Sequence, residues 1–115
     1  MSSNFILLQK LEDFADYLYP IIDRFPNREK WALCAQVKRQ LDDEIIRRTI
    51  RVQKIRNKGP LLFDLDVELD YLRILIRRAH TRKFLSGQKL KTSAEKLSEI
   101  GRILGGMIRS SGVRP

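Results

Sequence analysis

The chain has 115 residues, of which 43% are hydrophobic and 32% charged, with a formal net charge of +9. Its length favours a single domain over residues 1–115, and its hydrophobic content excludes a disordered chain. The single cysteine excludes an intrachain disulfide, and no apolar run reaches the roughly 18–20 residues that span a bilayer. Because no secretory signal opens the chain either, a cytoplasmic protein with no membrane partner is expected.

The first helix is predicted from residue 4 to about residue 24, with Ser3 as its N-cap. Pro20 should kink this helix because it lacks the amide proton that would bond the Asp16 carbonyl. The turn Phe25-Pro26-Asn27 ends it. The predicted apolar stripe repeats at steps of three and four and consists of Leu11, Phe14, Leu18, Ile21, Ile22 and Phe25.

A long second helix is predicted over residues 28–57, up to the break Asn57-Lys58-Gly59-Pro60. Arg48 and Thr49 interrupt its apolar stripe. The stripe itself consists of Trp31, Cys34, Val37, Leu41, Ile45, Val52 and Ile55.

The third helix is predicted over residues 61–85, and the fourth follows Ser86, its expected N-cap. The third stripe consists of Leu65, Leu69, Leu72, Leu75, Ile76 and Ala79. The fourth consists of Leu90, Ala94, Leu97, Gly101, Leu104 and Ile108. Four amphipathic helices with short connections predict an all-α fold, an antiparallel up-down-up-down four-helix bundle.

The positive charge is concentrated after the first helix. Residues 1–29 sum to −2, so the remaining residues carry +11. Two stretches within residues 47–58 and 73–83 hold bases and no acid, and rows of cations on helices suit phosphates. The predicted nucleic-acid-binding residues are Arg47, Arg48, Arg51, Lys54, Arg56, Arg73, Arg77, Arg78, Arg82 and Lys83.

The alternative reading of these bases is pairing between helices. In a hairpin about Gly59-Pro60, the first basic stretch would lie beside the acidic start of the third helix. Such surface ion pairs contribute little stability and could not absorb the whole excess of +11. Since no base-reading motif is present and aromatic residues do not interleave with the bases, recognition by shape and charge is expected.

No catalytic site, metal site or cofactor is expected. Asp64, Asp66, Glu68 and Asp70 lie at a helix start, and no second cluster completes a metal centre. Cys34 and His80 are the only residues of their types, so a catalytic pair would depend on chance proximity. A core cysteine and a surface histidine are expected instead.

Three glycines, Gly101, Gly105 and Gly106, lie in the last helix. Charged neighbours such as Arg102 exclude a membrane-helix contact motif, and no phosphate-binding loop pattern is present. Gly101 is therefore expected to permit close helix packing at the heart of the bundle. Gly105 and Gly106 are expected to serve a neighbouring subunit or to begin the fraying of the helix.

Several segments in order resemble the accessory variability (Avd) proteins of diversity-generating retroelements. The segments are YLYPI (17–21), RFPNREKWALCAQV (24–37), DVELDYLRILIRRAH (66–80), FLSGQKL (84–90) and LSEIGRILGGMI (97–108). The last is the most specific, and Met107 stands where the family often has tryptophan. The related four-helix proteins of ribosomal-RNA intervening sequences usually carry a different second helix, so the retroelement branch fits better. The alternative is a protein of that related type that acts as a structural or protein-interaction module.

The resemblance implies a non-enzymatic accessory protein. Members form homopentameric barrels with a basic surface, bind RNA or DNA with little sequence preference, and associate with the reverse transcriptase of the retroelement. That complex copies a template RNA into mutagenised cDNA. The expected partners are therefore the polymerase, template RNA, DNA and further copies of the chain.

Overall fold

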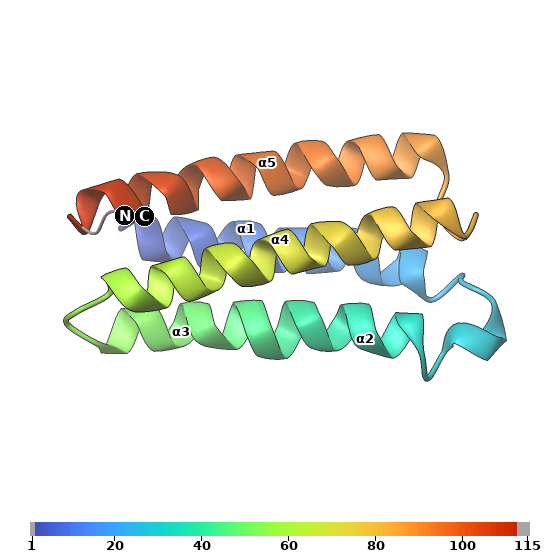
Figure 1. Cartoon of the computed structure of the whole chain (residues 1–115), viewed down its shortest axis with the longest axis horizontal. Coiled ribbons are helices and arrows are strands. Elements are labelled where there is room, and N and C mark those ends of the chain that lie inside the picture. The colour runs from blue at the N-terminus through green and yellow to red at the C-terminus, as the bar shows by residue number, and fades with distance from the viewer. Residues whose placement is uncertain (1, 113–115) are drawn as a thin grey trace.

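The computed structural model describes residues 2–112, and within them every regular element is helical (Figure 1). The elements are α1 (Ser3–Ile22), the 3-10 turn η1 (Asn27–Glu29), α2 (Leu33–Arg39), the π-helical η2 (Gln40–Ile46), α3 (Arg47–Lys54), α4 (Gly59–Thr81) and α5 (Gly87–Ser110). Since α2, η2 and α3 follow one another without a break, the described residues form four long helices. They lie side by side along a long axis of 43 Å, which confirms the predicted helical bundle.

One hydrophobic core runs along the axis and takes residues from all four long helices. The predicted stripe of α4 is buried throughout, and so is most of that of α1. The α5 stripe is rotated from its predicted position, because Ala94 is exposed and Ile100 is buried. Its buried residues are Ser93, Leu97, Ile100, Leu104 and Met107. None of the helices within residues 2–112 combines the length and apolar character needed to cross a membrane.

Serine caps mark the starts of α1 and α5. The Ser86 hydroxyl accepts a hydrogen bond from the Lys89 amide at 3.2 Å, as predicted for the start of α5. At α1 the prediction was one residue late, since Ser2 is the N-cap and accepts from the Phe5 amide. Helix α1 then continues through Pro20 to Ile22.

The second long helix begins at Leu33, five residues later than predicted. Pro26 and the 3-10 turn η1 carry the chain around the end of the bundle first. Trp31 lies in this connection and is 84% exposed, so its predicted place in the apolar stripe was wrong. Ile55, at the other end of that stripe, is half-buried.

The second long helix buries residues that are spaced four positions apart, and the π-helical η2 keeps them on one face of the helix. Leu41, Ile45 and Thr49 are all buried, and each four-residue step drifts by about 40° in an ideal α-helix. The wider π turn removes this drift. Thr49 fits the core because its hydroxyl donates to the Ile45 carbonyl at 2.8 Å. The buried amide of Gln40 donates to the carbonyl and carboxylate of Glu68 at 2.9 and 3.3 Å, which ties η2 to α4.

Helix α4 ends at Thr81, four residues earlier than predicted, in a Schellman arrangement. The Lys83 and Phe84 amides donate to the carbonyls of His80 and Ala79, both at 2.9 Å. Lys83 occupies the position that usually holds glycine, with φ of +66°. The left-handed conformation costs a lysine roughly 1–2 kcal/mol, so the stop is strained.

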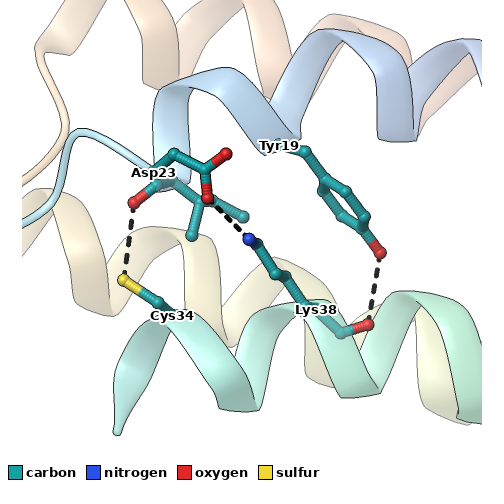
Figure 2. A network of polar contacts seen from close by, with 5 residues as sticks. Tyr19, Asp23, Cys34 and Lys38 are labelled. Carbon is teal, nitrogen blue, oxygen red and sulfur yellow. Dashed lines mark hydrogen bonds and ion pairs between the residues drawn. The ribbon is translucent and has the colours of Figure 1, made fainter. Parts of the chain in front are cut away.

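Polar contacts join α1 to α2 near the end of the bundle (Figure 2). The ammonium of Lys38 lies 2.6 Å from the Asp23 carboxylate, and the Tyr19 hydroxyl donates to the Lys38 carbonyl at 3.3 Å. The buried Cys34 thiol donates to the Ile22 carbonyl at 3.4 Å. Burial raises the pKa of Cys34, and burial together with Asp42 raises that of Tyr19. Both groups are therefore neutral at physiological pH.

Candidate nucleic-acid interface

The bundle keeps the two basic stretches apart. Residues 47–58 lie where α3 ends and α4 begins, at the same end of the bundle as the N-terminus (Figure 1). Residues 73–83 occupy the second half of α4 and the following loop, towards the other end. The ten predicted residues therefore do not form one continuous patch.

The α3 stretch divides into paired and unpaired cations. Arg47 and Arg48 contact Asp43 and Glu44 one turn earlier on the same helix, at 3.3 and 2.9 Å. Within residues 2–112 no ion pair involves the three remaining predicted cations, which are exposed: Arg51, Lys54 and Arg56. Those three are available to an anionic ligand. The neighbouring Lys58 donates instead to the Val52 carbonyl at 2.7 Å.

In the α4 stretch, Arg73 is held by the protein itself. Its guanidinium lies 2.6 Å from the Asp70 carboxylate and donates to the Leu97 carbonyl at 3.2 Å. Arg77, one turn on, is exposed, and Arg78 is half-buried. Arg77 is therefore better placed than Arg73 for a phosphate.

Arg82 and Lys83 lie at the end of the bundle, both exposed. The neighbouring Phe84 brings this loop to the connection between α1 and α2. Its ring centroid lies 5.7 Å from that of Phe25 and 5.6 Å from the Arg28 guanidinium. Cations from two connections thus share one end of the molecule.

The alternative pairing of residues 47–58 with the acidic start of α4 is not found among residues 2–112, and Arg73 of the second stretch pairs with Asp70 of its own helix. The ion pairs there that join different helices are Lys10–Glu99 at 2.9 Å and Lys38–Asp23. The hydrogen bond between Lys10 and Glu99 raises the pKa of the lysine and lowers that of the glutamate. Arg47 and Arg48 pair instead with acids one turn earlier on the same long helix.

A groove of about 300 Å³ lies between α4 and α5. Its lining is mostly apolar, with the stems of Arg73 and Arg77 on one side and Leu90 and Ala94 on the other. Among residues 2–112, no three His, Cys, Asp or Glu side chains gather as metal ligands would.

Sequence reasoning missed one group of exposed side chains. Arg28, Lys30 and Trp31 lie in or beside η1, and Lys30 Nζ lies 5.2 Å from the Trp31 ring centroid. Trp31 fitted the helical period of the following residues and was assigned to the core. The signal available in the sequence was its position within Arg28-Glu29-Lys30-Trp31, directly after a proline turn.

A protein-family model described as bAvd-like matches residues 5–111, which is nearly the whole chain. None of the curated proteins compared with it matches. The family match extends over all four long helices except the first two residues of α1, and it includes all ten predicted binding residues. The chain belongs to the bAvd-like family.

Proposed function

We propose that the protein is a non-enzymatic accessory protein of a diversity-generating retroelement. It binds RNA and DNA through exposed cations, associates with the reverse transcriptase, and supports mutagenic cDNA synthesis in the cytoplasm. The proposed assembly is a homopentameric barrel of antiparallel four-helix bundles. The family match supports the retroelement role, and the cation distribution supports nucleic-acid binding.

The observation that carries the proposal is the excess of exposed positive charge left after ion pairing. Five ion pairs form within residues 2–112, which hold 22 Lys and Arg side chains. Each pair joins one cation to one anion and leaves the net charge unchanged, so most of these cations stand outside the five pairs. Exposed cations spread over both ends of a 43 Å bundle suit a long polyanion better than a small anionic ligand.

A salt titration of RNA binding tests this proposal. The logarithm of the affinity should fall linearly with the logarithm of the salt concentration, with a slope of about −0.7 per contacted phosphate for a single strand. RNAs of different sequence and equal length should bind with similar affinity. Absent binding, or binding that ignores salt, would contradict the proposal.

Charge reversal locates the contacts. The pair Arg51→Glu and Lys54→Glu changes the α3 end, and Arg77→Glu with Arg82→Glu changes the other half of the molecule. Arg73 is left unchanged because its loss would disturb the packing of α4 on α5. The matched control is Arg39→Glu with Arg102→Glu, which changes the net charge equally at exposed positions outside both stretches. Equal losses in all three would show that only net charge matters.

A second candidate function is a protein-interaction module. An exposed apolar stripe on α4 favours it, since Val67 is 64% exposed, Ile74 43% and Tyr71 36%. Co-purification separates the two functions. Stoichiometric nucleic acid on the purified protein supports the first function, and association with a polymerase without affinity for RNA supports the second.

A further inference from the structure

The end of the bundle that holds Trp31 carries an exposed aromatic platform. Trp31 is 84% exposed and is the only tryptophan of the chain. It lies in the connection before α2, which carries it outside the helical stripe. The Phe25–Phe84 contact brings the loop between α4 and α5 to the same end of the bundle.

The surroundings of this tryptophan are cationic. Lys30 lies over the Trp31 ring, and the segment 71–94 contains no Asp or Glu. The acids of the connection before α2 are Asp23, which pairs with Lys38, and Glu29, whose carboxylate accepts a hydrogen bond from the Leu33 amide at 3.5 Å. The exposed cations of this end are Arg24, Arg28, Lys30, Arg82, Lys83 and Lys89.

An aromatic face among cations matches the chemistry of single-stranded nucleic acid. Unpaired bases stack on aromatic rings, while the phosphates between them are neutralised by Lys and Arg. A duplex offers its phosphates but keeps its base faces stacked. The pairing of Trp31 with Lys30 therefore favours an unpaired strand over a duplex.

Lys83 also favours the binding of nucleic acid at this end of the bundle. It occupies a left-handed position where glycine would be unstrained, and it is exposed at this end. Strained residues are retained where the surrounding structure or the function requires them. Here the side chain adds one more cation beside Arg82.

We infer that the end of the bundle formed by the η1 connection and the α4–α5 loop binds single-stranded nucleic acid, with Trp31 stacking on an unpaired base. The inference rests on the proposed function and names the form of nucleic acid and the residue that contacts a base. The surrounding cations hold the phosphates on either side of that base.

Intrinsic fluorescence tests the stacking directly, because Trp31 is the only tryptophan. The full-length protein is titrated with poly(U), with duplex RNA, and with heparin as a polyanion without bases. Poly(U) should quench the Trp31 emission, whereas heparin should bind without comparable quenching. Binding of poly(U) without quenching, or a free protein whose emission is that of a buried tryptophan, would overturn the inference.

Substitution gives the second test. Trp31→Ala should weaken poly(U) binding about tenfold, the order expected for one base–aromatic stack, and leave heparin binding unchanged. Trp31→Phe should retain most of the affinity. The matched control is Phe5→Ala, an exposed aromatic at the other end of the bundle, which should leave poly(U) binding unchanged.

The outcomes separate this inference from the proposed function. A wild-type protein that binds neither poly(U) nor heparin contradicts the proposed function itself. Salt-dependent binding that is equal in wild type and Trp31→Ala leaves the proposed function intact and overturns the inference. Loss of reverse transcriptase association in Trp31→Ala, with poly(U) affinity unchanged, also overturns it and assigns Trp31 to a protein contact.

Discussion

The guanidinium of Arg73 on α4 lies over Gly101 on α5. A Cβ atom at Gly101 would come within 2.7 Å of Arg73 Nη2, the nitrogen that donates to the Leu97 carbonyl. Gly101 is half-buried at the edge of the bundle, not at its heart as predicted. A Cβ atom there would have to displace the flexible end of the Arg73 side chain. Gly105 and Gly106 face only Arg109 of their own chain at ordinary distances, and their predicted role at a neighbouring subunit stays a prediction.

Gly101→Ala should therefore depend on Arg73. Alanine gains about 0.5–1 kcal/mol over glycine in a helix, but here it must displace the guanidinium and its hydrogen bond, which contributes about 1 kcal/mol. In the Arg73→Ala background the substitution should raise the free energy of unfolding by the full gain. In the wild-type background it should be nearly neutral. Urea unfolding of the four proteins forms a double-mutant cycle, and equal effects in both backgrounds would contradict the coupling.

Gln40→Ala should destabilise the bundle. The substitution removes the two hydrogen bonds to Glu68 and leaves a small cavity beside α4, at a cost of about 1–2 kcal/mol. The control is Gln53→Ala, which changes an exposed glutamine of α3 and should alter stability by less than about 0.5 kcal/mol. Thermal and urea unfolding measure both. Similar values for the two variants would show that the buried amide contributes nothing specific.

The Cys34 thiol should react slowly in the folded protein. Burial raises its pKa, so the thiolate is scarce at pH 7–8 and the reagent has little access. The reaction with a disulfide reagent should accelerate strongly in denaturant. A native rate equal to the denatured rate at pH 7 would contradict the burial.

The raised pKa of Cys34 also determines how the stability of the protein changes with pH. Folding raises the pKa of the Cys34 thiol. The buried neutral thiol therefore makes its full contribution to the free energy of unfolding below the pKa of the unfolded thiol, about 8.5. It is lost as the pH rises from there through the folded pKa, since the unfolded chain then loses a proton that the folded protein keeps. Cys34→Ala should therefore show a smaller loss of stability between pH 8 and 10 than the wild type. Identical pH profiles would show that the thiol does not titrate differently on folding.

Lys83→Gly should leave stability unchanged or raise it by up to about 1 kcal/mol. Glycine relieves the left-handed strain of roughly 1–2 kcal/mol, and the freedom it adds to the unfolded chain offsets about half of that. Lys89→Gly is the contrasting variant, because Lys89 lies in the first turn of α5 and glycine should weaken that helix. The melting temperatures of the two variants measure this difference. A Lys83→Gly protein as unstable as the Lys89→Gly protein would show that the left-handed backbone of Lys83 is not strained.

Local pattern was sufficient for much of the fold. The stripe from Leu65 to Ala79 is buried as predicted, and Ser86 caps α5, because helical period and capping depend on residues a few positions apart. The same reasoning failed at Trp31, whose spacing fits the helix but whose backbone follows the turn at Pro26. The π turn that keeps Thr49 in the core, and the shifted stripe of α5, depend on packing against other helices.

The sequence by itself determined the helical class, the excess of positive charge and membership of its family. Composition gives the charge, and local periodicity gives the helices. Only the tertiary structure decided which cations are exposed: Arg73 is held over Gly101, while Arg51 and Arg82 remain available. It also placed Trp31 beside cations at one end of the bundle. Both results depend on which side chains meet across helices, and residues far apart in the chain come together only when it folds.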